Sequence, residues 1–249
     1  MNGNKAKILG VSLNSSSTSL LLNTVVELAM TQGGRSKPTI VFTPNPEFLV
    51  EAQKDKDFQD LLNRSDINLV DGFGLVLAGG ILKRNVGERI SGADVVERLL
   101  EEGNQKKWTI GVAGARKGDQ VESKELFEKL KVTYPNVKFL NLDDSKFQIS
   151  NFKFQIVLAC HGMKKQEQWI WENKDKIKAN VFMGVGGSLD FLTGFSRRAP
   201  SIIRRIGLEW LWRGLHKPQH FKRIWKATAV FGWMVLREKL SLVFGLNSK

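Results

Sequence analysis

The sequence predicts an α/β fold: a Rossmann-like, mostly parallel sheet with helices on both faces, followed by a basic amphipathic helical appendage. Between residues 6 and 195, short apolar runs alternate with amphipathic segments, which is typical of a sheet covered on both sides. After residue 196, basic side chains and tryptophans replace this alternation. The change predicts an α/β domain over residues 1–196 and a helical appendage over residues 197–249.

The expected strands are the apolar runs themselves, in chain order Lys7–Val11, Thr39–Thr43, Asn68–Asp71, Trp108–Ala113, Val137–Leu140, Gln155–Cys160 and Val181–Val185. The expected helices have apolar residues at helical spacing and are Thr18–Met30, Glu47–Leu62, Phe73–Leu82, Ala93–Glu102, Gln120–Val132 and Lys165–Asn173. Serine and threonine residues before the first helix suit N-capping. Two segments, Ser12–Ser19 and Gly33–Pro38, are expected to be loops. Ligands of parallel sheets bind at the carboxyl ends of the strands.

Composition excludes several classes of protein. The chain has 249 residues, of which 42% are hydrophobic, so it has enough apolar side chains for a large core and is not mainly disordered. The single cysteine, Cys160, excludes a disulfide framework, and we expect an ordinary buried thiol there. The first residues lack the apolar core of a signal peptide, and no uncharged apolar run reaches the roughly 18 residues of a spanning helix. We therefore expect a cytoplasmic protein.

The net charge of +13 is concentrated in the appendage. Residues 197–249 have 12 basic and 2 acidic side chains and four of the seven tryptophans, whereas residues 1–196 have a net charge of only +3. An anionic partner is therefore expected at the appendage rather than at the body.

An apolar stripe runs along the last helical stretch of the appendage. Its members are Trp225, Ala229, Gly232, Trp233, Leu236, Leu240 and Val243, and the basic residues beside them are Lys222, Arg223, Lys226, Arg237 and Lys239. The pattern favours a helix in the interface of an anionic membrane. Two alternatives remain open: the stripe packs on the body or on a second copy of the chain, or the basic residues hold nucleic acid.

Two charged residues near strand ends are candidates for chemistry. Asp71 follows a buried strand and precedes a glycine, which suits a general base. The alternative is that Asp71 caps the helix that begins at Phe73. Arg89 has the fork geometry to clamp a phosphate, and a surface salt bridge is the alternative.

Two glycine clusters also follow expected strands. The segment Gly111–Gly118 suggests either a phosphate-binding turn or a tight turn without a ligand, and it lacks a complete dinucleotide fingerprint. The segment Gly184–Gly187 is the better anion nest, although such clusters are often only turns. The sequence has neither a P-loop nor a Gly-x-Ser-x-Gly elbow.

A metal site is not expected. The acidic pairs Asp143-Asp144 and Asp55/Asp57 lie in polar segments that are expected to be solvated. The three histidines, His161, His216 and His220, have no ligand spacing with Cys160.

Several of these segments together resemble the WecG/TagA/CpsF family of bacterial glycosyltransferases. The matching segments occur in order from about residue 40 to residue 225 and are Thr43–Glu47, Asp71–Gly74, Glu88–Asp94, Gln166-Glu167, Gly184–Asp190, Arg198–Pro200 and Gly207–Arg213. Each alone is a weak signal, whereas the ordered set is specific.

The resemblance implies transfer of a sugar from a UDP-sugar to a polyprenyl-diphosphate-linked sugar at the inner face of the cytoplasmic membrane. In the teichoic-acid members, N-acetylmannosamine is added to undecaprenyl-diphosphate-N-acetylglucosamine with inversion, without a metal. The resemblance implies no cofactor beyond the UDP-sugar donor. The implied roles are a general base at Asp71, pocket residues at Thr43 and Asn45, phosphate or acceptor contact at Arg89, nucleotide-sugar contact at Gln166, and diphosphate neutralisation by Arg213 and Arg223.

The chemistry agrees with these residue types, because inverting transfer needs a base for the acceptor hydroxyl and cations or amides for the departing diphosphate. The arginines and the backbone of Gly184, Gly186 and Gly187 are expected to supply that stabilisation. The expected membrane contacts are Arg204, Arg205, Trp210, Trp225, Trp233 and Arg237, with a homo-oligomer as another way to cover apolar surface.

Two positions depart from the family pattern. Lys164 stands where the family usually has proline, and His220 stands at a position that is commonly arginine. The donor sugar stays open: a donor such as UDP-glucose or a UDP-uronic acid is an alternative, and a uronic acid needs an extra cation such as Lys164 or Arg116. A non-catalytic nucleic-acid module and an enzyme of soluble sugars are the other functional alternatives.

Overall fold

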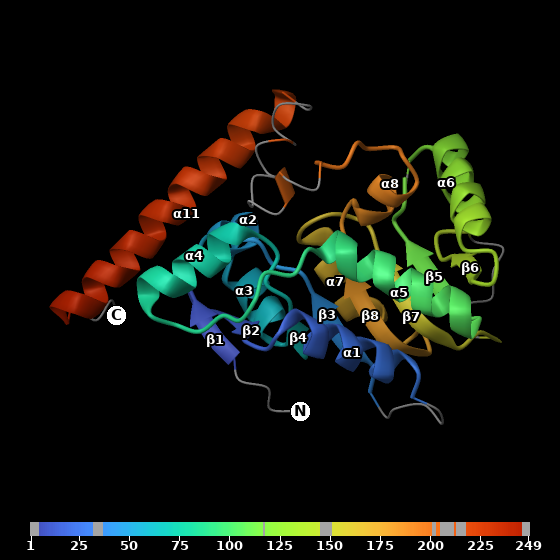
Figure 1. Cartoon of the computed structure of the whole chain (residues 1–249), viewed down its shortest axis with the longest axis horizontal. Helices are drawn as coiled ribbons and strands as arrows, with labels where there is room; N and C mark the ends of the chain where they lie inside the picture. The colour runs from blue at the N-terminus through green and yellow to red at the C-terminus, as the bar shows by residue number, and fades with distance from the viewer. Residues whose placement is uncertain are drawn as a thin grey trace.

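The computed structural model describes residues 5–31, 37–116, 118–144, 151–200, 203–204, 212 and 218–245, without the side chains of residues 218–224 and 226. In these residues the chain forms a six-stranded parallel sheet, flanked by helices, and a separate two-stranded hairpin. The predicted α/β class is therefore confirmed (Figure 1).

The sheet places strands that are distant in sequence side by side. Its members are β3 (Thr39–Phe42), β4 (Ile67–Asn68), β5 (Thr109–Ala113), β6 (Lys138–Asn141), β7 (Phe154–Ala159) and β8 (Ala179–Gly184). Their order is β4-β3-β8-β7-β5-β6, and every neighbouring pair is parallel. All carboxyl ends therefore lie at one edge, where the ends of β3, β4 and β8 are neighbours.

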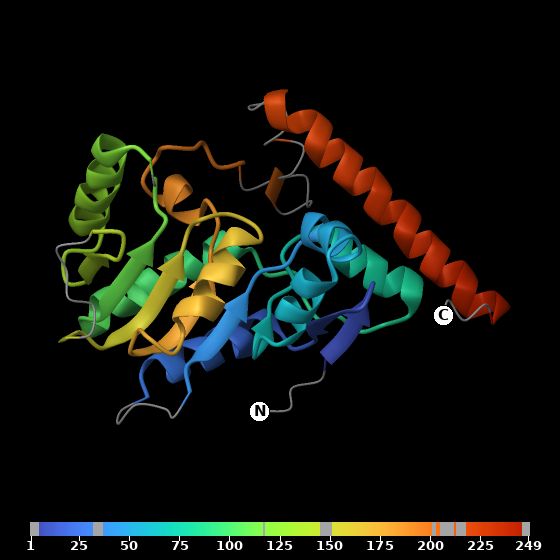
Figure 2. The same ribbon diagram turned by 180° about the vertical axis from the view of Figure 1, so that it is seen from behind.

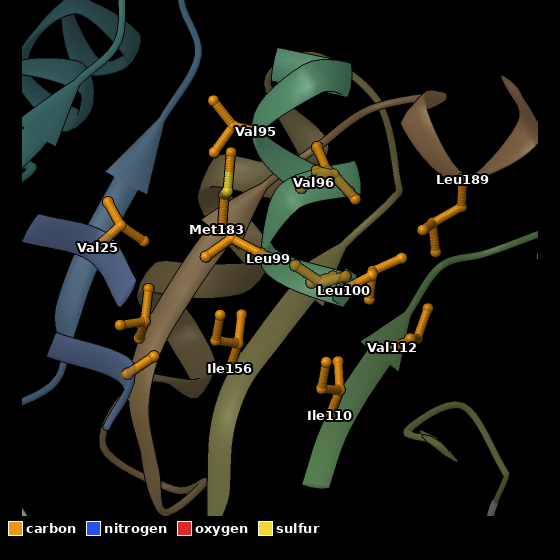
Figure 3. Packing of buried hydrophobic residues seen from close by; sticks show 14 of the residues in the cluster. Val25, Val95, Val96, Leu99, Leu100, Ile110, Val112, Ile156, Met183 and Leu189 are labelled. Carbon is orange, nitrogen blue, oxygen red and sulfur yellow. The ribbon is translucent and has the colours of Figure 1, made fainter. Parts of the chain in front are cut away.

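A hydrophobic core fills each face of the sheet. On one face lie α1 (Thr18–Ala29), α5 (Gly92–Lys106), α6 (Gln120–Thr133) and α8 (Ser188–Leu192). Figure 3 shows Val95, Leu99 and Met183 in this core. On the other face lie α2 (Pro46–Ala52), α3 (Lys56–Asn63), α4 (Phe73–Leu82) and α7 (Lys165–Asn173). Side chains alternate between the two cores along β3, because successive residues of a strand point to opposite faces.

The N-terminal segment is a hairpin, so the predicted single strand Lys7–Val11 and the loop predicted from Ser12 are wrong there. Strands β1 (Lys5–Ile8) and β2 (Val11–Asn14) pair antiparallel around a turn at Leu9 and Gly10. Both turn residues have positive φ, 47° and 76°. A leucine at such a position is uncommon, so the turn lacks the usual Asn-Gly signature.

One helix prediction is corrected and one helix is added. The predicted helix Glu47–Leu62 is two helices, α2 and α3, because the chain turns at Gln53 and the Asp55 side chain caps α3 by accepting from the Phe58 amide. Helix α8 is an addition to the prediction. Ser17 caps α1 as expected, accepting from the Leu20 amide. The predicted loop Gly33–Pro38 lies mostly outside the described residues.

The last helix, α11 (Pro218–Phe244), lies along α2 and α4 in both views of the molecule (Figures 1 and 2). Phe231 and Val235 are buried and share the core of that face of the sheet. Glu238 fixes the helix further, since its carboxylate accepts from Arg84 Nη1 over 2.5 Å and from the Leu9 amide over 3.2 Å. The boundary near residue 196 stays a prediction.

Candidate active site

The carboxyl ends of β3, β4 and β8 bring three predicted residues together. Thr43, directly after β3, donates from Oγ1 to the carbonyl of Gly184 at the end of β8 over 3.2 Å. Gly92 lies against both Thr43 and Asp71: a methyl group on Gly92 would be 3.2 Å from Thr43 Cγ2 and 3.3 Å from Asp71 Oδ2. The structure therefore places Thr43, Asp71 and Gly184 at one point of the sheet edge.

Asp71 is not the cap of α4, so that interpretation is wrong. The N-cap of α4 is Gly72, whose φ is 117° and which has no side chain that could cap the helix. Asp71 Oδ2 instead accepts from the Gly92 amide at the start of α5 over 3.3 Å. A helix N-terminus stabilises a nearby carboxylate because its amides and dipole are positive. The half-buried Asp71 carboxylate is thus held by a neighbouring helix.

Backbone hydrogen bonds fix the position of Asp71 from both sides. The Asp71 amide donates to the carbonyl of Pro44 over 3.1 Å, and the Ile90 amide donates to the carbonyl of Val70 over 2.8 Å. Three segments of the predicted site, the one after β3, the one after β4 and the one before α5, are therefore joined. Asn45 caps α2, because its Oδ1 accepts from the amides of Glu47 and Phe48.

A buried polar pair follows β7 at the start of α7. Gln166 and Glu167 have 1% and 0% of their surface exposed. Gln166 Nε2 donates to Glu167 Oε1 over 2.6 Å, and Gln166 Oε1 accepts from the Gly186 amide over 2.8 Å. Burial raises the pKa of the Glu167 carboxyl to about 7, against the opposing effect of its hydrogen bonds.

These contacts change the predicted role of the glycine cluster. The Gly186 amide points to Gln166, so it does not face an anion as the nest interpretation requires. The absence of a side chain at Gly184 lets the Gln166 side chain lie close to the backbone of β8, since a methyl group at Gly184 would be 3.0 Å from Gln166 Nε2. Gly186 has a positive φ, 53°, and Gly187 is the N-cap of α8. The cluster therefore connects the sheet edge to Gln166.

Glu167 is the residue that the sequence analysis missed, because it was considered only as the start of a helix. Two signals were present: a Gln-Glu pair at the start of the helix that follows a parallel strand, and an acidic side chain at the third position of that helix. The second is the position of a capping-box carboxylate, and Glu167 Oε2 does accept from the Lys164 amide over 2.6 Å.

Arg89 contacts the segment that leads to α11. Its Nη1 donates to the carbonyl of Arg204 over 2.5 Å, so the predicted phosphate clamp touches the beginning of the appendage. The Arg204 guanidinium pairs with Asp94 of α5 over 3.2 Å, and Arg198 pairs with both Asp94 and Glu97. Arg204, which was predicted to contact a membrane, is thus engaged by α5, and its role there stays a prediction.

The turn after β5 is already closed by acidic side chains. The Gly114 amide donates to Asp143 Oδ2 over 2.6 Å, and the Arg116 side chain pairs with Asp190 and Glu122. A carboxylate at Gly114 favours the tight turn over a phosphate-binding turn. Cys160 at the end of β7 is half-buried, and burial of its sulfur raises the pKa of the thiol.

The apolar stripe of α11 faces away from the body. Trp225 and Trp233 are 56% and 66% exposed, and the remaining stripe residues are exposed as well, whereas the buried Phe231 and Val235 lie on the opposite side of the helix. The stripe therefore does not pack on the body. Arg237 is exposed on the same helix. Among the described residues, no helix is both long and apolar enough to cross a membrane.

Several predicted positions are not tested by these contacts. Arg205, Trp210 and Arg213 lie outside the described residues, as does the side chain of Arg223. Within the described part of the chain, no cluster of His, Cys, Asp or Glu side chains has the composition of a metal site.

The chain is similar to known enzymes over most of its length. The model of the glycosyl transferase WecG/TagA/CpsF family matches residues 6–243. The chain is 33% identical over 193 residues to an N-acetylglucosaminyldiphosphoundecaprenol N-acetyl-beta-D-mannosaminyltransferase of Bacillus subtilis (strain 168), and the match covers 74% of each protein. It is 27% identical over 243 residues to a protein of the same name from Staphylococcus aureus (strain MW2), with 94% of this chain and 93% of the relative covered.

Proposed function

The chain belongs to the WecG/TagA/CpsF family of glycosyltransferases, and from that premise we propose that it transfers N-acetylmannosamine or a related sugar from a UDP-sugar to a polyprenyl-diphosphate-linked GlcNAc acceptor. The curated relatives are named for this acceptor and this sugar. The observation that carries the proposal is the position of Asp71: it lies beside Thr43 and Gly92 at the sheet edge, and its Oδ2 accepts from the Gly92 amide. Teichoic-acid or exopolysaccharide synthesis is the corresponding role.

In the proposed mechanism Asp71 is the general base of an inverting transfer. Its carboxylate takes the proton of the acceptor hydroxyl while that oxygen attacks the anomeric carbon, and the bond from the sugar to UDP breaks. Thr43 and Asn45 line the pocket around this carboxylate. The Gly92 amide donates to Oδ2 and so holds the carboxylate at the sheet edge.

Negative charge develops on the departing diphosphate, and cations or amides stabilise it. We assign this role to Arg89 together with Arg213 and Arg223 of the appendage, with the transfer independent of a metal. Arg89 already contacts the segment that leads to the appendage, since its Nη1 donates to the carbonyl of Arg204.

The structure favours a donor whose sugar is uncharged. A uronic acid needs a cation near the sugar, and the two cations considered for it are both paired. Lys164 Nζ lies 2.5 Å from Asp55 Oδ2 and 3.7 Å from Glu51 Oε1, and Arg116 is paired with Asp190 and Glu122.

The exposed stripe of α11 is proposed to lie in the inner face of the cytoplasmic membrane, where a lipid-linked acceptor is held. Tryptophans insert at the level of the headgroups, and Arg237 attracts anionic lipid. A homo-oligomer that covers the stripe is the competing arrangement. A nucleic-acid module needs its basic residues to form the contact face, whereas here the exposed face of α11 is mainly apolar.

A donor panel tests the proposed function. The full-length protein is incubated with a short-chain lipid-diphosphate-GlcNAc acceptor and, in turn, UDP-N-acetylmannosamine, UDP-N-acetylglucosamine, UDP-glucose and a UDP-uronic acid. Release of UDP with the first donor and formation of a disaccharide product support the proposal. Release with another donor corrects the sugar, while salt-sensitive binding of DNA or RNA with no response to UDP overturns the proposal.

A further inference from the structure

A chain of three hydrogen bonds links the start of α7 to the turn after β8, and no step of the proposed transfer uses it. The Lys164 amide donates to Glu167 Oε2, Gln166 Nε2 donates to Glu167 Oε1, and the Gly186 amide donates to Gln166 Oε1, over 2.6, 2.6 and 2.8 Å. Both ends of this chain are backbone N–H donors. The pair of side chains between them, Gln166 and Glu167, must therefore present an acceptor atom to each of these two N–H groups.

This requirement fixes the chemistry of the middle of the chain. An amide has one accepting end and one donating end, so two neighbouring amides between two N–H donors leave one donor facing another donor. A carboxylate accepts with both oxygens and removes the conflict. Glu167 is thus the residue that determines which end of the Gln166 amide faces Gly186.

We propose that Glu167 is a positioning residue of the donor site: its carboxylate orients the Gln166 amide and, through it, the Gly186 backbone at the carboxyl edge of the sheet. This assignment rests on the proposed function only for the identity of the ligand, a nucleoside-diphosphate sugar. Glu167 itself is fully buried and touches no open surface. It therefore acts through Gln166.

Protonation of Glu167 weakens the same chain. A neutral carboxyl group has lost its negative charge and carries a proton on Oε1 or Oε2, so the protonated oxygen has less capacity to accept from Gln166 Nε2 or from the Lys164 amide. Because burial raises the pKa of this carboxyl to about 7, protonation occurs just below neutral pH. Lys164, three residues before it, pairs with both Asp55 and Glu51. His161, stacked on Trp169 of α7, is a further titratable group beside this helix.

Isotope labelling isolates the Gly186 amide in the full-length protein. The chain contains two Val–Gly pairs, Val86–Gly87 and Val185–Gly186. Carbonyl-¹³C valine combined with ¹⁵N glycine therefore selects two amide signals, one from Gly186 and one from Gly87 as an internal control. The Gly186 signal is expected to titrate with a midpoint near pH 7 in the wild-type protein, and the Gly87 signal is expected to stay constant across that range.

Three variants test whether Glu167 causes this titration. Glu167→Gln should abolish it, whereas a titration caused by another group, such as His161, would persist in this variant. Glu172→Gln, at an exposed position of the same helix, should leave it unchanged. The exchange Gln166→Glu/Glu167→Gln keeps every donor opposite an acceptor, so it should return the Gly186 signal toward its wild-type position at pH 8.

Donor binding completes the test, with UDP as the probe in a thermal-shift titration. Glu167→Gln should weaken UDP-sugar binding about tenfold, because it leaves a buried N–H group without a hydrogen-bond acceptor. The loss should be seen as a raised KM for the UDP-sugar with a smaller change in kcat. A Gly186 signal that titrates identically in Glu167→Gln overturns the positioning role. If the signal behaves as expected but UDP does not stabilise the wild-type protein, the positioning role stands and the proposed function fails.

Discussion

The Gly92 amide donates to Asp71 Oδ2 over 3.3 Å, so the first residue of α5 touches the proposed general base directly. The same glycine packs against Thr43, which leaves no room for a side chain between the two pocket residues. The absence of a side chain at Gly92 therefore allows α5 to begin in contact with the Asp71 carboxylate.

Gly92→Ala is therefore expected to lower kcat about tenfold in a protein that still folds, because its methyl group displaces Asp71 or Thr43. Gly80→Ala is the matched control, since a methyl group at this exposed position of α4 meets nothing within 4 Å. Steady-state kinetics and thermal unfolding of both variants check the prediction. Normal turnover in Gly92→Ala would show that the contact is not needed.

The two faces of α11 should respond differently to truncation of an aromatic side chain. Phe231→Ala removes a ring that is 5% exposed and should lower the free energy of unfolding by about 3 kcal/mol. Trp233→Ala, two residues along the same helix and 66% exposed, should change it by less than about 0.5 kcal/mol. Urea unfolding of the two variants measures this difference. Equal losses would mean that the stripe is buried against another surface.

Membrane binding should depend on the exposed face alone. Arg237→Gln should weaken binding to vesicles containing phosphatidylserine about fivefold at low salt, because each such charge contributes about 1 kcal/mol. Trp225→Ala and Trp233→Ala should weaken binding further, also with neutral vesicles. Vesicle co-sedimentation of the folded variants is the measurement. These variants are cleaner than deletion from residue 197 onward, which uncovers the core that Phe231 and Val235 close. Unchanged binding in all three would locate the membrane contact elsewhere.

The buried Glu167 should make stability fall as pH rises. Its pKa is about 7 in the folded protein, above the ordinary value of 4.5 for a glutamate, so the folded state binds more protons between these two pH values. Relative to Glu167→Gln, the wild-type protein should therefore lose stability as pH rises from about 4.5 to about 7. Chemical unfolding at several pH values gives the difference. A difference that is independent of pH would place the pKa of Glu167 near its ordinary value.

The sheet and most helices were predictable because their signals are local. Continuous apolar runs identified the parallel strands, and the helix Phe73–Leu82 has the predicted bounds. The hairpin at Leu9 was missed because its turn has an unusual residue at positive φ. The break between α2 and α3 was missed because apolar spacing continues through it, while the Asp55 cap that divides the helices is a single side chain.

The site was predictable to the level of which residues lie at strand ends, since parallel strands share one edge. What each side chain contacts there was not. The choice between base and cap at Asp71 depends on α5, which begins some twenty residues later. The importance of Glu167 depends on burial by β8 and on the direction of the Gly186 amide, and both are tertiary properties.

Transfer by Asp71→Asn is the decisive measurement. Asparagine keeps the shape of the side chain and can still accept from the Gly92 amide, so the fold and UDP binding should be preserved, but it cannot take the acceptor proton. The variant should lose about 10²-fold or more in kcat with the lipid-diphosphate-GlcNAc acceptor and UDP-N-acetylmannosamine. Turnover within about threefold of the wild-type protein, at unchanged thermal stability, would contradict the assignment of Asp71 as the base.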